Sequence, residues 1–378
     1  MPHRKNRLPC LRQLSSLFCF LWITLPSLLC NDPYVNAAGA DPVRGVLVRP
    51  ERVTSELLEA WKARGATSVV VPVDDALDRV QWAAMANRVE QAELLLYIWI
   101  EVARNPAMAE AHPEWMAAAG GHHQDWRRRF PKAPPTRKGE VVKAWPWVPI
   151  GYAPAFEAHR QRLRRVLDGL PGKWSGVFLN DLQAGPSSCG CGNDQCRWAL
   201  DYGTPSTAPK TPGDDAAARL VSELQDAHPG KAFIPVWVTE CETIDLADAE
   251  GSTGLCGTVP CAKGSCWPRY AASWNSLLKA ANGPVAWAAW SETFERDPVK
   301  WVETGRALFE NPPHGGLVLP AERTVTVLQG WSKPDNALIP LLERAKRVSG
   351  GWVLALDPIE QSWEPKAIAL DREPAPGS

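Results

Sequence analysis

The order of apolar and amphipathic segments constrains this chain more than any other feature. After residue 40, short apolar runs that are typical of strands alternate with longer segments whose apolar residues recur at helical spacing. This alternation is the pattern of βα units around a parallel sheet. Eight runs predict strands, at Val46–Arg49, Ser68–Val73, Leu94–Ile100, Gly176–Asn180, Phe233–Thr239, Val285–Trp290, Thr324–Leu328 and Trp352–Leu356. The count predicts an α/β fold, a (β/α)8 barrel of the TIM type.

The segments between these runs predict the helices of the barrel. They are Ser55–Arg64, Asp78–Ala92, Ala155–Leu170, Asp214–Ala227, Tyr270–Ala281, Val299–Phe309 and Leu338–Val348. One barrel with long loops after strands 3, 4 and 5 accommodates residues 41–378, so we expect a single domain. The segment Glu101–Gly151 shows little periodicity and predicts no regular element. No helix is predicted after the last strand, so we expect the last unit of the barrel to be imperfect.

The first 40 residues predict a signal peptide. Four basic residues between Arg4 and Arg12 precede the apolar run Leu14–Leu29, and Ala38-Gly39-Ala40 matches a cleavage site. Cys30 would also suit a lipoprotein, but Leu29 is a poor match to the small residue expected before it. We therefore expect a secreted or periplasmic protein without a stable membrane insertion after cleavage.

The charge of the chain favours a neutral or small partner. The formal net charge of −1 at pH 7 gives no electrostatic footprint for nucleic acid. Tryptophan is abundant, with 19 residues against 8 Phe and 5 Tyr. Indole rings stack well on the apolar faces of sugars, although most of these residues are expected to fill core space. We therefore expect a carbohydrate partner.

Polar residues follow nearly every predicted strand. In such barrels the functional groups lie at the C-terminal ends of the strands, so these residues are expected to surround one opening. They are Arg49, Asp74, Asp75, Glu101, Arg104, Asn180, Asp181, Glu240, Glu242, Glu292, Glu295, Gln329, Trp331, Asp357 and Glu360.

Two carboxyl groups on either side of a glycosidic bond can cleave it, one as acid and the other as nucleophile or base. Asp181 and Glu240 are the favoured pair, because they end adjacent predicted strands. Asp181 is assigned as nucleophile and Glu240 as acid, with Glu292 as a competitor for the acid. Candidate substrate contacts are Arg49, Asp74, Glu101, Arg104, Asn180, Trp237 and Trp290, with a wall of the cleft from His112, Trp115, Trp126, Trp145 and Trp147.

Two phrases of the sequence resemble glycoside hydrolases. Gly-Val-Phe-Leu-Asn-Asp, ending at Asp181, looks like the fourth-strand phrase G-(I/V)-x-L-D-D of barrel glycoside hydrolases, which ends in a catalytic aspartate. His112-Pro113-Glu114-Trp115 is similar to a segment of barrels related to amylases. The resemblance implies a glycosidase, and it departs at Asn180, where those proteins usually have a second acid. A barrel that binds carbohydrate without cleaving it, and a hydrolase of another bond, are the alternatives.

Seven cysteines cluster after strands four and five. They are Cys189, Cys191, Cys196, Cys241, Cys256, Cys261 and Cys266. Disulfides suit an oxidising compartment. Three thiolates at C-x-C-x₄-C spacing with Cys241 also suit a structural zinc site, and an odd total leaves one thiol over in an all-disulfide account. The cluster resembles the zinc-binding cysteines of family 42 β-galactosidases. No cofactor is expected for catalysis.

Overall fold

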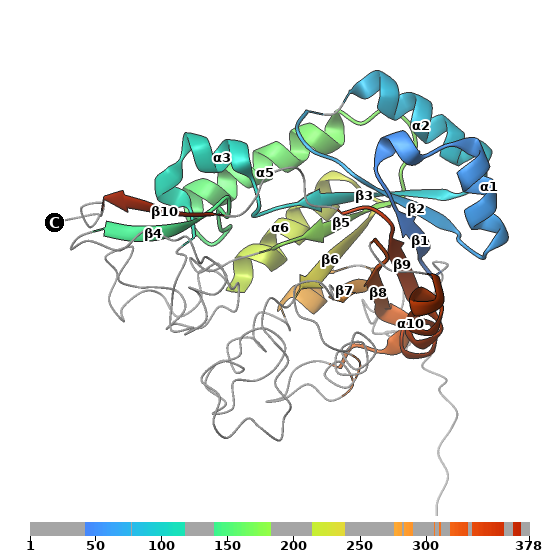
Figure 1. Ribbon diagram of the computed structural model, residues 1–378. Helices are drawn as coiled ribbons and strands as arrows, with labels where there is room; N and C mark the ends of the chain where they lie inside the picture. The colour runs from blue at the N-terminus through green and yellow to red at the C-terminus, as the bar shows by residue number, and fades with distance from the viewer. Residues whose placement is uncertain are drawn as a thin grey trace, which may run out of the picture. The chain divides into compact units, whose positions relative to one another are not determined.

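The protein folds as a closed barrel of eight parallel strands with helices outside it (Figure 1). The computed structural model describes residues 42–76, 78–117, 140–182, 214–238, 276–281, 283–289, 306, 310, 318–331, 335–358 and 366–371, all in the unit Gly39–Ser378. The barrel strands, in spatial order, are β1 (Arg44–Leu47), β2 (Ser68–Pro72), β3 (Leu95–Glu101), β5 (Gly176–Asn180), β6 (Ala232–Val238), β7 (Val285–Ala289), β8 (Thr324–Gln329) and β9 (Gly351–Ala355). The predicted fold class and strand count are confirmed.

The barrel closes between its first and last strands. β9 pairs with β1 in parallel register, from Arg44 opposite Trp352 to Leu47 opposite Ala355. Gly351 permits this closure, because a Cβ there would lie only 2.5 Å from the carbonyl oxygen of Val43. Backbone pairing of β9 with β1 thus closes the barrel. The segment after β9, for which no helix was predicted, lies mostly outside the described residues, so the expectation of an imperfect last unit stays a prediction.

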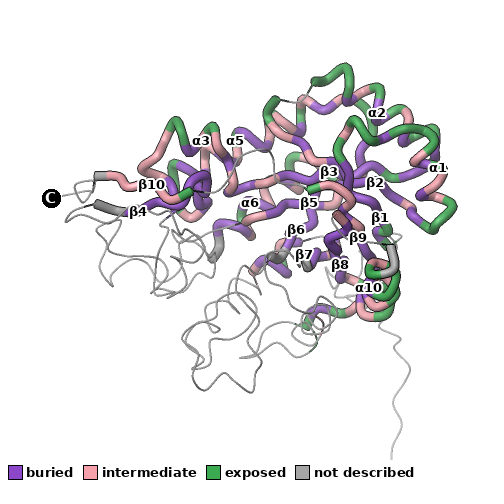
Figure 2. Tube along the Cα trace, viewed as in Figure 1, coloured by how far each residue is buried: buried purple, intermediate pink, exposed green. Residues whose placement is uncertain are grey.

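Strand alternation gives the barrel an apolar lumen. The inward residues pack as one buried cluster: Val43, Leu47, Val70, Tyr97, Trp99, Phe178, Ile234, Val236, Ala286, Ala288, Val325, Val327, Val353 and Ala355. The Phe178 ring lies 5.8 Å from the rings of Tyr97 and Trp99, edge-on to the first and stacked on the second. Figure 2 shows that the barrel strands are mostly buried. The lumen is a packed core, as in other barrels of this kind.

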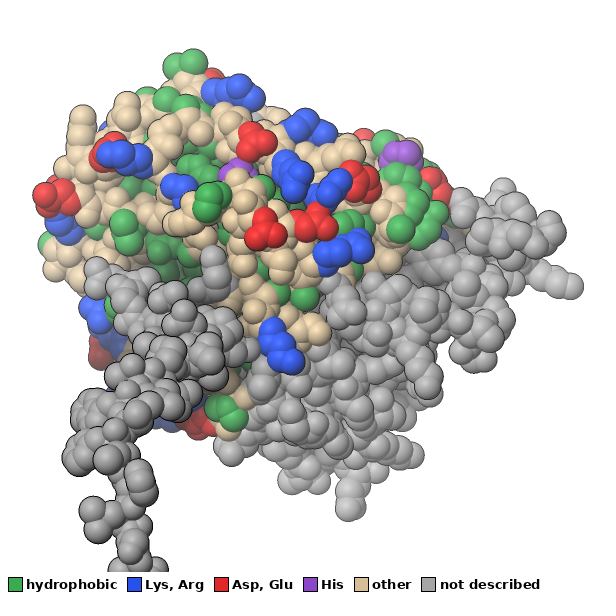
Figure 3. Space-filling view, turned by 180° about the vertical axis from the view of Figure 1, so that it is seen from behind, with side chains coloured by type: hydrophobic (Ala, Val, Ile, Leu, Met, Phe, Trp, Pro, Cys, Tyr) green, Lys and Arg blue, Asp and Glu red, His purple; other side chains and the backbone are tan. Residues whose placement is uncertain are grey.

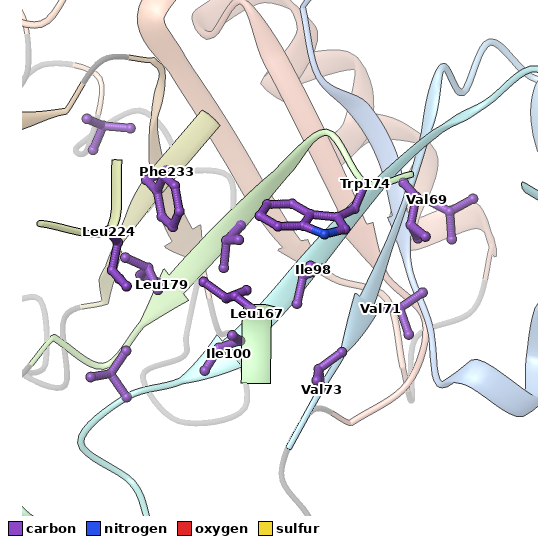
Figure 4. Packing of buried hydrophobic residues seen from close by; sticks show 14 of the residues in the cluster. Val69, Val71, Val73, Ile98, Ile100, Leu167, Trp174, Leu179, Leu224 and Phe233 are labelled. Atoms are coloured by element: carbon purple, nitrogen blue, oxygen red, sulfur yellow. The ribbon is translucent and has the colours of Figure 1, made fainter. Parts of the chain in front are cut away.

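The outward residues of the same strands face a layer of helices. This layer includes α1 (Ser55–Ala63), α2 (Arg79–Gln91), α5 (Ala153–Asp168), α6 (Asp214–Ala227) and α10 (Asp335–Val348). Figure 4 shows Ile98, Ile100 and Leu179 of the strands beside Leu167 of α5 and Leu224 of α6.

Side-chain caps define where two of these helices begin. The Thr54 hydroxyl accepts from the Leu57 amide at α1, and Asp78 accepts from the amides of Val80 and Gln81 at α2. Such caps satisfy amides that have no partner within the helix. None of the helices in the described part of the chain is long and apolar enough to cross a membrane.

The segment predicted to be irregular contains regular elements. Helix α3 (Pro106–Ala111), the 3-10 turn η3 (Pro113–Trp115) and strand β4 (Glu140–Trp145) all lie within it. β4 pairs antiparallel with β10 (Lys366–Asp371), so that a small second sheet joins two segments far apart in the sequence. The prediction was wrong here because the two strands are short and each depends on a distant partner.

Candidate functional site

The inward rows of β3 and β5 carry polar residues to the C-terminal mouth of the barrel. Tyr97 and Trp99 of β3 and Phe178 of β5 lie in the lumen cluster. Because side chains alternate along a strand, Glu101 and Asn180 continue these rows at the strand ends. The register places the two residues directly opposite one another. Burial raises the pKa of the Tyr97 hydroxyl deeper in the lumen.

Glu101 is oriented by donors from both strands. The amide nitrogen Nδ2 of Asn180 lies 2.8 Å from Oε1 and 2.9 Å from Oε2 of Glu101 and donates to this carboxylate. The indole Nε1 of Trp99 donates to Oε1 at 2.9 Å. Asn180 is buried, whereas Glu101 is partly exposed. The apolar lumen therefore ends in a carboxylate with a fixed orientation.

Asp181 lies beside this row rather than on it. Its Oδ2 is 3.5 Å from Nε of Arg104, and each side chain is 15% exposed. Arg104 follows β3, and its guanidinium carbon lies 4.9 Å from the centre of the Trp147 ring. The φ angle of Asp181 is 53°, a left-handed conformation that is uncommon for residues other than glycine and is often found at functional sites.

Asp357, after β9, holds the loop that follows β1 through two polar contacts. Its Oδ2 accepts from the backbone amide of Arg49 at 3.0 Å, and its Oδ1 lies 2.5 Å from the guanidinium of Arg52. The structure therefore places Arg49 at the mouth through its backbone, while its side chain is exposed.

Asp74, after β2, lies at an outer pocket. Its Oδ1 accepts from the amide of Ala76 at 2.9 Å. The pocket has a volume of about 320 Å³ and is lined by Asp74, Asp75, Arg79, Arg165, Val166, Gly169 and Leu170, between α2 and α5. Figure 3 shows acidic and basic side chains interspersed on one face of the molecule. No hydrogen bond between described residues joins Asp74 to Glu101, Asn180 and Trp99, which together form the Glu101 cluster.

The aromatic residues after β3 pack largely against one another. The His112 ring stacks on the Trp115 indole with 3.6 Å between ring centres and 7° between planes, and Tyr152 meets Trp115 edge-on at 6.0 Å. His112 therefore covers one face of the Trp115 ring. Trp145 and Trp147 are only 7% and 1% exposed, so the expectation that these two wall a cleft is wrong, because both fill core clusters.

The remaining predicted site residues lie outside the described residues. They are Glu240, Glu242, Glu292, Glu295, Glu360, Trp290, Trp126 and the seven cysteines Cys189, Cys191, Cys196, Cys241, Cys256, Cys261 and Cys266. For Trp237 the structure gives only the backbone register, opposite Trp287 of β7. Among the described residues, no group of three or more His, Cys, Asp or Glu could hold a metal ion.

The sequence hypothesis placed weight on Asp181 and gave Glu101 and Asn180 only as substrate contacts. Counting alternate residues back from Asn180 would have placed Asn180 in the row of Phe178 and Asp181 outside it. The contact between Asn180 and Glu101 then follows from strand order, since β3 and β5 are neighbours in the barrel and their two apolar runs were predicted as consecutive strands. The sequence therefore carried both signals.

Comparisons with known proteins identify no family for this chain. No protein family model matches the sequence, and no curated protein matches it either. An α-L-fucosidase from Paenibacillus thiaminolyticus aligns with a TM-score of 0.47 and 10% identity over 84% of this chain and 46% of its own. A β-galactosidase from Marinomonas ef1 aligns with 0.46 and 9% over 82% and 53%. An aldolase from Desulfitobacterium hafniense aligns with 0.35 and 9% over 84% and 87%.

Proposed function

We propose that this protein cleaves glycosidic bonds of a carbohydrate at the C-terminal mouth of its barrel. One observation carries the proposal: the apolar lumen ends in the Glu101 carboxylate, which Trp99 and Asn180 hold from two neighbouring strands. Active sites of barrel enzymes lie at this end of the strands, and they require groups held in a fixed orientation.

Asp181 is the proposed nucleophile or base, and Glu240 or Glu292 is the proposed acid. Arg104 supplies a positive charge beside Asp181, which suits a carboxylate that acts in its charged form. Glu101 competes with Asp181 for this role, because it lies on the inward row and is oriented by three contacts. The two carboxyl groups must flank the bond, about 5–5.5 Å apart for retention and 6.5–9.5 Å for inversion.

The remaining assignments belong to the same proposal. The proposed substrate contacts are Arg49, Asp74, Arg104, Asn180, Trp115, His112, Trp237 and Trp290. The seven cysteines hold one structural zinc ion or form disulfides, and the chain is secreted after loss of residues 1–40. One zinc per chain by metal analysis, or three disulfides by intact mass under non-reducing conditions, separates the two states of the cysteines.

A barrel that binds carbohydrate without cleaving it is the second candidate. The observation that favours it is that the carboxylates of Glu101 and Asp181 already have partners within the chain. Glu101 accepts from Asn180 and Trp99, and Asp181 is paired with Arg104. In this reading the polar end of the lumen orients hydroxyl groups of a sugar and performs no chemistry.

The test begins with a screen of the purified protein against aryl glycosides and polysaccharides, for turnover and for binding. On any substrate that is cleaved, Asp181→Asn, Glu240→Gln and Glu292→Gln are compared with wild type. Asn tolerates the left-handed backbone of Asp181, so this variant changes the charge with little backbone strain. Loss of a catalytic acid or base is expected to lower kcat by about 10²–10⁴-fold.

Glu343→Gln on α10 is the matched control, since Glu343 is an exposed carboxylate paired with Lys346. Its turnover is expected to equal that of wild type. Saturable binding without turnover would favour the second candidate. The absence of both turnover and binding across the whole screen would show that the proposed function is wrong.

A further inference from the structure

A backbone carbonyl at the end of β3 lies beyond the reach of the neighbouring strand. The carbonyl of Trp99 accepts from the amide of Val73, at 2.9 Å, on the β2 side of the strand. Alternation directs the carbonyl of Glu101 to this same side. β2 ends at Pro72, and its ladder with β3 ends where Pro72 lies opposite Trp99. A donor for the Glu101 carbonyl must therefore come from another element.

Arg162 of α5 supplies this donor. Its terminal nitrogen Nη2 donates to the carbonyl oxygen of Glu101 at 2.7 Å and to the carbonyl oxygen of Val102 at 3.3 Å. The other terminal nitrogen lies 3.9 Å from Oδ1 of Asp75, in the loop after β2. One guanidinium group thus connects the ends of two barrel strands to the helix layer.

The burial of Arg162 shows that this contact is costly to make. The residue is 6% exposed, and burying a guanidinium removes its hydration. Burial lowers the pKa of Arg162, and the carboxylates of Asp75, Glu101 and Asp74 oppose that shift. An apolar residue would pack at this position without the loss of hydration, but it would leave the Glu101 carbonyl without its donor.

We propose that Arg162 is a positioning residue for Glu101: it fixes the peptide that carries this side chain, so that the carboxylate meets Asn180 and Trp99. The inference rests on the proposed function only in assigning Glu101 to a substrate site. Arg162 itself lies behind the strand, bonded to the backbone, and does not contact the carboxylate through any hydrogen bond between described atoms.

The chain offers a matched control two residues away on the same helix. Arg160 pairs with Glu157 at 2.6 Å and with Glu223 at 3.1 Å, and its side chain is 29% exposed. Arg160→Met removes an arginine from α5 without touching β3. Arg162→Met removes the donor to β3, whereas Arg162→Lys keeps a charged donor with a shorter reach.

The first readout is the division of the effect between kcat and KM on a cleaved substrate. A misplaced functional group lowers the rate of the chemical step, and a displacement of about 1 Å can cost about 100-fold. Arg162→Met is expected to lower kcat by about this factor with KM within about 3-fold. Arg162→Lys should recover about a tenth or more of the lost activity, and Arg160→Met should match wild type.

The second readout needs no activity. Protein labelled with 5-fluorotryptophan gives a ¹⁹F resonance for Trp99, assigned by its loss in Trp99→Phe. Glu101→Gln changes the partner of the Trp99 indole and should shift this resonance. Arg162→Met should shift the same resonance, Arg162→Lys should shift it less, and Arg160→Met should leave it in place. Dispersed ¹⁹F spectra establish that each variant is folded.

The outcomes separate the two proposals. A moved Trp99 resonance supports the positioning role even if the wild-type protein cleaves no glycoside, in which case the proposed function alone fails. A Trp99 resonance that stays in place in folded Arg162→Met overturns the inference. Equal loss of activity in Arg160→Met and Arg162→Met would also overturn it, because a general effect on α5 would then explain both. If Arg162→Met does not fold, Arg162→Lys decides by the same criteria.

Discussion

The lumen of the barrel and its C-terminal mouth are built from the same strands, but packing stabilises the lumen and hydrogen bonds stabilise the mouth. In the lumen, Phe178 and its neighbours are buried and stabilised mainly by packing. At the mouth, Glu101 and Asn180 are polar, and hydrogen bonds to specific atoms hold them. Trp99 belongs to both regions, since its ring stacks on Phe178 and its Nε1 donates to Glu101. The lumen contributes packing to stability, and the proposed function assigns the chemistry to the mouth.

The largest effect is expected in the lumen. Phe178→Ala removes a fully buried ring that touches both Tyr97 and Trp99, and should lower the free energy of unfolding by about 3–5 kcal/mol. Chemical denaturation measures this change. Phe178→Leu, which keeps most of the volume, should cost less than about 1.5 kcal/mol. Equal costs for the two variants would contradict the view that the lumen is close-packed.

Acid should destabilise the fold through a histidine outside the lumen. Burial, with a smaller contribution from the charge of Arg162, lowers the pKa of His159 on α5 to about 3, although Nε2 of this histidine lies 2.8 Å from the carbonyl oxygen of Val148. As the pH falls, the His159 side chain of the unfolded chain takes up a proton before that of the folded chain does. The contribution of His159 to the free energy of unfolding is therefore fully present above pH 6.5 and falls as the pH drops towards 3. The slope is about 1.4 kcal/mol per pH unit.

Denaturation at a series of pH values tests this prediction, with His159→Gln as the comparison. Gln keeps a donor for Val148 and has no group that titrates, so the variant should lose this part of the slope between pH 6 and 4. An unchanged slope would assign the acid sensitivity to other groups.

Asn180→Asp converts the mouth into two facing carboxylates. The Asn180 amide donates to Glu101 at 2.8 Å, so the variant replaces a hydrogen bond by repulsion between like charges, one buried and one partly exposed. We expect a loss of about 2 kcal/mol in stability at pH 7. Uptake of one proton by the pair relieves the repulsion, so this variant should gain stability relative to wild type as the pH falls towards 5. Neutral behaviour at both pH values would show that the contact is not maintained in solution.

The smallest effect is expected at the second left-handed residue. Glu93 has a φ angle of 57° just after α2, where the Leu94 amide donates to the Val89 carbonyl and the Glu93 amide to that of Glu90. This is the helix ending in which glycine is favoured. Glu93→Gly should raise Tm by about 1–2 °C. Glu93→Gln controls for the ion pair with Lys62, and a decrease in Tm for the glycine variant alone would contradict the backbone argument.

The barrel could be predicted from sequence because each strand is a local apolar run. The eight runs identified the eight barrel strands with bounds close to those observed, for example Gly176–Asn180 for β5. The sheet of β4 and β10 could not be predicted in this way, because neither strand is identifiable without the other. Glu101 has its side-chain partners on β3 and β5, which were predicted as consecutive strands, and only its backbone partner lies on α5. Arg162 gave no signal of its own, since a single arginine on an amphipathic helix is usually exposed.

One comparison decides whether the Glu101 cluster carries the activity at the mouth of the barrel. It is the kcat/KM of Glu101→Gln against that of wild type on the best substrate of the screen, with Tm measured for both proteins. We expect the kcat/KM of Glu101→Gln to be lower than that of wild type by about 10²-fold or more, with a nearly unchanged Tm. A kcat/KM within about 3-fold of wild type in a folded variant would contradict it.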